Sequence, residues 1–236
     1  MKVLGLDSSG LVAGVALIQD DVLIAEYTTN YKKTHSQTLL PMLDELRRMV
    51  DLDLKSIDLI AVAAGPGSFT GLRIGSATAK GLGLALDIPL AAVPTVDALA
   101  YNLYGCEQLI CPMMDARRGQ VYTGIYTFVN GEMQVIQEQC AISVEELVGR
   151  LKEECKKYGK KVVLLGDGVP VYREKVQEIL QGQCEFAPAS CNRQRAACVA
   201  VLGQSLAAAG KTVSSDDFAP EYLCLLYTSD AADDLI

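Results

Sequence analysis

The sequence predicts an α/β protein made of two copies of one unit, in which three strands, a helix, a strand and a helix follow one another (βββαβα). Two observations predict this. The order of elements in the first half of the chain recurs in the second half, and each half opens with a strand that ends in an aspartate, Asp7 or Asp115. With 236 residues, 50% of them hydrophobic, the chain is long enough to bury a core in one large or two modest domains.

The first unit begins with three short strands, predicted at residues 2–7, 13–18 and 22–27. The polar residues at 19–21 form a plausible turn between the second strand and the third. A helix is predicted over about residues 37–50, because its apolar side chains recur with helical spacing on one arc.

The most informative segment is the glycine-rich stretch that follows the predicted strand 58–64 and continues as a helix to Leu86. This helix is apolar nearly all round, so it must be covered on two sides. Its small residues recur every fourth position, which suits close approach of two backbones: Gly71, Gly75, Ala79 and Gly83. Two interpretations stay open, in which the second cover is a partner or another layer of the same domain.

The second half repeats this order with strands predicted at 109–115, 120–127 and 133–138. Ser143 and Glu146 form a capping box that begins a helix to about Tyr158. A strand over 162–168 then enters a glycine turn, and a last helix is predicted over 194–209.

Between the halves, Thr95 is predicted to cap a helix from Val96 to about Tyr104. We therefore expect an N-terminal domain over 1–104 and a C-terminal domain over 105–223, with a natural ligand site in the crevice between them.

The composition restricts the function classes. The formal net charge of −8 argues against a surface that grips nucleic acid directly, so contact with RNA is expected only through a partner. Eight cysteines without a C-x-x-C pair indicate reduced thiols in a reducing compartment. No apolar run reaches about 18 residues and no signal peptide is visible, so we expect a cytoplasmic protein that does not contact a membrane.

The ends of the repeated strands resemble the nucleotide-binding hairpins of the actin, Hsp70 and sugar-kinase group. Asp7, Ser8 and Ser9 stand at the first phosphate hairpin, Asp115 holds the matching place, and the turn Gly166, Asp167 and Gly168 lies where that group contacts adenosine. Ser9 replaces the glycine that lets backbone amides approach phosphate, which predicts a degenerate site. The glycine-rich segment is not a P-loop, since Leu72 follows Gly71 where a lysine is required.

Other catalytic classes lack their residues. His35 is the only histidine, and Leu39 occupies the position four residues later where a second metal-binding histidine would stand. No G-x-S-x-G motif presents a nucleophilic serine. We therefore expect neither a zinc peptidase nor a hydrolase of the Ser-His-Asp type.

Taken together, six segments resemble the TsaB (YeaZ) family, the dimerisation subunit of the bacterial tRNA threonylcarbamoyladenosine synthase, and the resemblance covers residues 1–223. The segments are Leu4-Gly-Leu-Asp-Ser-Ser9, His35-Ser-Gln-Thr-Leu39, Gly65-Pro-Gly-Ser-Phe-Thr-Gly-Leu-Arg-Ile-Gly75, Pro94-Thr-Val-Asp97, Asp115-Ala-Arg-Arg118 and Pro220-Glu-Tyr-Leu223. The resemblance implies two tandem actin-like (ASKHA, RNase H-like) domains.

It also implies a non-catalytic subunit, with no catalytic residues, no metal and no cofactor, that pairs with a TsaD-type catalytic subunit. Together with a TsaE-type ATPase, that pair transfers threonylcarbamoyl to the adenosine beside the anticodon. In the absence of the partner, the apolar helix also suits a homodimer. The residues expected to contact the partner are Leu39, Leu43, Leu72, Gly75, Ser76, Ala79, Leu82 and Gly83. The alternative is an active ATP-dependent kinase or ATPase of the actin-like superfamily that uses Asp7 and Asp115.

The last residues, 224–236, depart from the family, which continues with a basic, polar tail. This segment resembles translated sequencing-adapter sequence. We therefore predict that it is not native, and that Cys224 does not belong to the natural protein.

Overall fold

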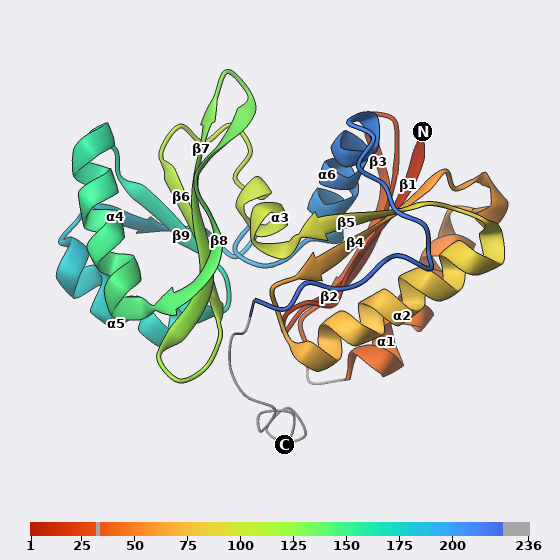
Figure 1. The fold of residues 1–236 in the computed structure, drawn as a ribbon, viewed down its shortest axis with the longest axis horizontal. Helices are drawn as coiled ribbons and strands as arrows, with labels where there is room; N and C mark the ends of the chain where they lie inside the picture. The colour runs from red at the N-terminus through yellow and green to blue at the C-terminus, as the bar shows by residue number, and fades with distance from the viewer. Residues whose placement is uncertain (32–33, 224–236) are drawn as a thin grey trace. The chain divides into compact units, whose positions relative to one another are not determined.

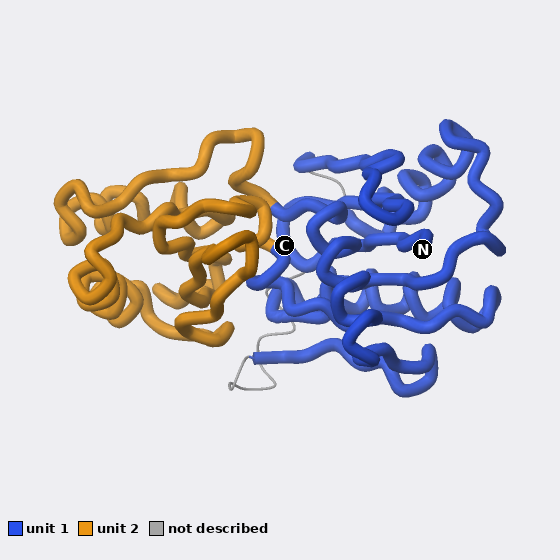
Figure 2. Tube along the Cα trace, turned by 90° about the horizontal axis from the view of Figure 1, so that it is seen from above, with its two compact units in different colours: residues 1–98, 194–236 blue, residues 99–193 orange. Residues whose placement is uncertain are grey.

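A computed structural model describes residues 1–31 and 34–223 and divides the chain into two compact units (Figure 2). Unit 1 comprises residues 1–98 and the chain from 194 onward, and unit 2 comprises residues 99–193. The segment 224–236, predicted to be non-native, lies outside the described residues.

Unit 1 is built on a five-stranded mixed sheet with the order β3-β2-β1-β4-β5. The strand β2 pairs antiparallel with β1 and with β3, whereas β4 and β5 run parallel to β1. The elements are β1 (Lys2–Asp7), β2 (Ala13–Gln19), β3 (Val22–Thr29), α1 (His35–Met49), a short 3₁₀ helix η1 (Leu54–Ser56), β4 (Leu59–Gly65), α2 (Phe69–Leu86) and β5 (Leu90–Pro94). The helix α3 (Thr95–Tyr101) begins in unit 1 and ends in unit 2.

Helices cover both faces of this sheet, with α1 and α2 on one face and α6 (Ala196–Ala208) on the other (Figure 1). One core cluster joins α1 and α2 to the sheet, and a second joins α6 to it. Because β1 and β4 lie inside the sheet and are buried on both faces, their sequences are nearly continuous apolar runs.

Unit 2 repeats the topology with the order β10-β9-β6-β7-β8, in which β6 takes the place of β1. Its core packs α4 and α5 against the sheet. The elements are β6 (Leu109–Asp115), β7 (Gln120–Val129), β8 (Glu132–Ser143), α4 (Val144–Tyr158), β9 (Val162–Leu165), α5 (Gly168–Leu180) and β10 (Cys184–Phe186).

The predicted duplication of a βββαβα unit is confirmed, and so is the predicted capping of α4, where the Ser143 hydroxyl accepts a hydrogen bond from Glu146 N (3.1 Å). Besides the short 3₁₀ helix η1, three elements were missed. The strands β5 and β10 have only 5 and 3 residues, too few for a periodic pattern, and α5 opens with Gly168 and Pro170, which are typical of a loop.

The predicted domain boundary at residue 104 is wrong for the last helix. Residues 105–223 were expected to form one domain, but α6 returns to unit 1 and packs on β1, β2, β4 and β5. The approach is close at Gly203, where an added Cβ would stand 2.3 Å from the Ala61 Cβ. Elements that follow one another in the chain usually pack together. A contact between segments this far apart therefore leaves no pattern in the local sequence from which it could be predicted.

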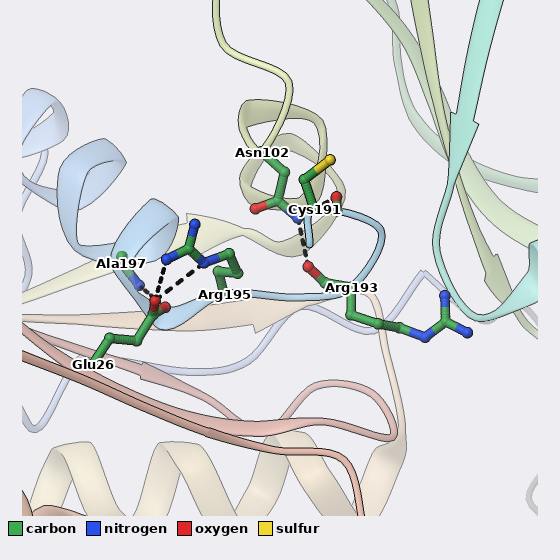
Figure 3. Close-up of polar contacts among 6 residues, drawn as sticks. All are labelled: Glu26, Asn102, Cys191, Arg193, Arg195 and Ala197. Atoms are coloured by element: carbon green, nitrogen blue, oxygen red, sulfur yellow. Dashed lines mark hydrogen bonds and ion pairs between the residues drawn. The ribbon is translucent and has the colours of Figure 1, made fainter. Parts of the chain in front are cut away.

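Polar contacts hold the returning segment on each side of residue 194 (Figure 3). In unit 2 the Asn102 amide donates to the backbone oxygens of Cys191 (3.1 Å) and Arg193. In unit 1 the Glu26 carboxylate, only 10% exposed, pairs with Arg195 and accepts a hydrogen bond from Ala197 N (3.0 Å) at the start of α6. These contacts fix where α6 begins.

Within the described residues, no helix has the length and apolar character needed to cross a membrane.

Candidate functional site

The glycine-rich segment forms the turn between β4 and α2. The Ser68 hydroxyl caps α2 by accepting a hydrogen bond from Gly71 N (3.2 Å). Thr95, predicted as a helix cap, is instead the first residue of α3, and its hydroxyl accepts a hydrogen bond from Gly65 N (3.1 Å). The segment is thereby held at both ends.

The residues predicted to contact a partner face the interior of unit 1, and that placement needs correction. Only Leu82 is half-buried, and the other seven are buried: Leu39, Leu43, Leu72, Gly75, Ser76, Ala79 and Gly83. A partner surface cannot reach side chains that the sheet already covers.

Close packing inside unit 1 explains the glycine stripe of α2. An added Cβ would stand 2.1 Å from Ser8 O at Gly71, 2.7 Å from Ser8 Oγ at Gly75, and 2.1 Å from Ser215 Oγ at Gly83. At Gly71 the atom approached is backbone, so that position requires glycine, whereas at Gly75 and Gly83 a serine hydroxyl group would have to move. The sequence left open whether the second cover of α2 is a partner or another layer of the same domain. The layer that these glycines approach belongs to the protein's own domain.

The opposite side of α2 carries a second row, which we call the exposed α2 row: Arg73, Ala77, Gly81, Leu84 and Ala85. Leu84 is 59% exposed, and an added Cβ at Gly81 would meet nothing within 4 Å. Beside it, α1 exposes Leu40. The partner contact was predicted on the buried stripe instead, although the small residues of this row have the same four-residue spacing, offset by two from that stripe.

The loop after β1 lies under the start of α2. The Asp7 Oδ1 atom accepts hydrogen bonds from Ser9 N (2.9 Å) and Ser9 Oγ (2.6 Å). Ser8 Oγ donates to Gly71 O (2.8 Å), and Ser9 O accepts from Ser68 N (2.7 Å). Both serines are therefore buried beneath the glycine-rich segment.

His35 begins α1 and its Nε2 atom lies 2.7 Å from Gly10 O. Across residues 1–31 and 34–223, no cluster of three or more histidine, cysteine, aspartate or glutamate side chains is placed to hold a metal ion. The single histidine is thus engaged with the backbone of the loop that follows β1.

Burial raises the pKa of the Asp7 carboxyl above its ordinary value of 3.8, and the hydrogen bonds from Ser9 oppose this only in part. At pH values between 3.8 and the raised pKa, Asp7 binds more protons in the folded chain than in the unfolded chain. The free energy of unfolding therefore falls as the pH rises through that window.

Replacing Asp7 by asparagine should therefore raise the melting temperature at neutral pH, because Oδ1 keeps its contacts and the buried charge is removed. The gain should shrink as the pH falls below the raised pKa. Thermal unfolding followed across pH measures both effects, with the exposed Asp21→Asn as the control that should match wild type. An Asp7→Asn protein less stable than wild type at neutral pH would contradict this account.

In unit 2 the predicted residues do come together at the end of β6. Asp115 N donates to Asp167 Oδ1 (3.2 Å), and the Tyr172 hydroxyl donates to Asp115 Oδ1 (3.3 Å). Burial raises the pKa of the Asp167 carboxyl. The turn packs tightly, since a Cβ at Gly166 would stand 2.2 Å from Met113 O and one at Gly168 would stand 3.0 Å from it.

Comparisons with known proteins agree with this architecture. A family model described as TsaD, tRNA N6-adenosine threonylcarbamoyltransferase, matches residues 22–231. The tRNA threonylcarbamoyladenosine biosynthesis protein TsaB of Bacillus subtilis is 35% identical over 95% of this chain and 95% of that protein. The TsaB protein of Escherichia coli is 28% identical over 94% of each chain.

A solved structure of YeaZ from Pseudomonas aeruginosa superposes with a TM-score of 0.74 at 26% identity, covering 94% of this chain and 99% of that one. The shared fold spans both units, so the predicted α/β class with two tandem units of one topology is confirmed. The chain therefore belongs to the TsaB (YeaZ) family, as its motifs indicated.

Proposed function

We propose that this chain is a non-catalytic subunit that binds and positions a TsaD-type catalytic subunit, with a TsaE-type ATPase, for threonylcarbamoyl transfer to the adenosine beside the anticodon of tRNA. Its relatives are named for the biosynthesis of this modified nucleoside. The observation that carries the binding role is the exposed α2 row, in which Arg73 is the only charged residue.

The row suits a helix of a partner. Ala77, Gly81 and Ala85 follow one another at four-residue spacing, so they lie along one side of α2 and leave room for a second backbone to approach. Leu84 supplies an exposed apolar side chain on the same side. We therefore propose that the partner contacts this row and the neighbouring helix α1, and not the buried stripe.

The loop geometry supports a role without turnover. A working phosphate hairpin presents backbone amides to its ligand. Here Ser9 N donates to Asp7, and Ser9 O accepts from the glycine-rich segment that covers the loop. The formal net charge of −8 supports contact with tRNA through the partner rather than through this chain.

A binding experiment tests the proposal. We expect Leu84→Glu and Ala77→Glu to weaken the complex with the TsaD-type subunit of the same organism by about tenfold or more, because each places a charge in an apolar contact. Val171→Glu on α5 is the matched control, since Val171 is also 59% exposed, and it should bind as wild type does.

Size-exclusion chromatography with light scattering, followed by titration calorimetry, measures the outcome. Failure of the wild-type chain to form a complex, with the TsaE-type ATPase and nucleotide also supplied, would overturn the proposal. Calorimetry with ATP and magnesium on the chain alone tests the alternative kinase or ATPase. Self-association that is lost in Leu84→Glu would show that the same row also forms a homodimer.

A further inference from the structure

A C-terminal strap, residues 213–222, runs beside α2 as the blue segment after α6 (Figure 1). It begins at β5, where Val213 and Leu90 exchange two backbone hydrogen bonds (2.8 and 2.9 Å). Lys80 Nζ of α2 donates to the backbone oxygens of Asp216 (3.3 Å) and Phe218 (3.1 Å). The Phe218 side chain, 3% exposed, enters the core between α2 and the sheet. The strap is therefore part of the α2 layer.

The strap ends against the glycine-rich segment. Glu221 N donates to Ala64 O (2.7 Å), and a Cβ at Gly65 would stand only 2.0 Å from Glu221 O. Gly65 also has a backbone φ angle of +128°, which residues with a side chain rarely adopt. Gly65 and Glu221 lie in two of the six segments that resemble the family, and most of the chain separates these two segments. The two residues thus meet at the N-terminal end of α2.

Beside this contact, three side chains form a row that we call the stack, in which Phe69 contacts Tyr222 through a tilted ring pair and Arg73 through a cation–π contact. The rings of Tyr222 and Phe69 are 5.3 Å apart between centroids, and the Arg73 guanidinium carbon lies 3.8 Å from the Phe69 centroid. Despite the stack, Tyr222 remains 46% exposed. Phe69 and Arg73 are held by the start of α2, and Tyr222 is held by the strap.

The stack is continuous with the exposed α2 row, because Phe69, Arg73 and Ala77 are spaced four residues apart. No carboxylate occurs in α2, and within the described residues Arg73 forms no salt bridge. Lys80, the other cation of the helix, is occupied by the strap's carbonyl oxygens. Arg73 is thus the charge that this surface offers, on a chain that is acidic overall.

We infer that the stack of Tyr222, Phe69 and Arg73 anchors the TsaD-type subunit at the N-terminal end of α2. This inference rests on the proposed function. The strap would then act as part of the binding surface as well as a brace for α2. The partner surface should present an apolar side chain to the Tyr222 ring and a carboxylate to Arg73. Tyrosine and arginine are enriched among residues that dominate binding energy, and Tyr222 and Arg73 are here already ordered by their contacts.

Titration calorimetry with the full chain and the TsaD-type subunit tests the inference. Tyr222→Ala and Arg73→Ala should each weaken binding by about tenfold. Tyr222→Phe should bind as wild type does because the ring is retained, and Arg73→Glu should weaken binding more than Arg73→Ala does. Tyr158→Ala in unit 2 is the matched control, since Tyr158 is 43% exposed and also stacks with a cation, Lys157.

Melting temperatures distinguish a variant that has lost a contact with the partner from one that is destabilised. A variant that binds weakly but melts with wild type supports the inference. If Tyr222→Ala loosens the strap and lowers the melting temperature, Arg73→Glu decides, because Arg73 is exposed on a helix that stays braced. Wild-type affinity in both Arg73 variants and in Tyr222→Ala would overturn the anchor while leaving the proposed function in place. Absence of binding by the wild-type chain would instead overturn the proposed function.

Discussion

Gly71→Ala should lower the free energy of unfolding by about 3 kcal/mol, whereas Gly81→Ala in the same helix should raise it by up to about 1 kcal/mol. At Gly71 the added methyl group would stand 2.1 Å from the backbone oxygen of Ser8, and neither the helix nor the loop can yield without breaking the Ser8 to Gly71 hydrogen bond. At Gly81 nothing lies within 4 Å, so alanine gains its higher helix propensity at no steric cost.

Urea unfolding of the two variants measures this pair of opposite effects. Because the substitution is identical and the positions lie in one helix, differences in the unfolded state largely cancel. Equal effects at Gly71 and Gly81 would contradict the assignment of the buried stripe to close packing against the loop after β1.

Glu26→Ala should destabilise the chain by about 3 kcal/mol, near the lower end of the range for a broken buried ion pair. The Glu26 side chain is 10% exposed and binds both the Arg195 guanidinium and Ala197 N (Figure 3). Its loss removes that acceptor from the first turn of α6 and removes the carboxylate that pairs with Arg195. Because Arg195 is itself 40% exposed, water replaces some of the lost contact.

The matched control is the ion pair of Lys161 with Glu185, whose side chains are 54% and 56% exposed. Glu185→Ala should change the free energy of unfolding by less than about 1 kcal/mol, since exposed pairs contribute little. Chemical denaturation gives both values. A Glu26→Ala protein as stable as Glu185→Ala would show that α6 is held by its apolar face alone.

The sequence by itself determined the elements that have a local pattern. The alternation of short apolar strands and the repeated strand ending in Asp7 or Asp115 predicted the duplicated units, and the capping box at Ser143 predicted the start of α4. Its motifs also identified the family. These features succeed because periodicity, caps and glycine turns depend on neighbours within a few residues.

Only the tertiary structure decided which side of α2 is free and where the last helix belongs. A helix that is apolar nearly all round has no polar arc to mark its outer face. The sequence therefore could not show that Gly71, Gly75 and Gly83 face inward, which follows from their close approach to Ser8 and Ser215. Likewise, α6 returns to unit 1, where Glu26 accepts a hydrogen bond from its first turn and Gly203 lies close to Ala61. Such contacts join residues far apart in the chain, and their geometry exists only once the sheet has formed.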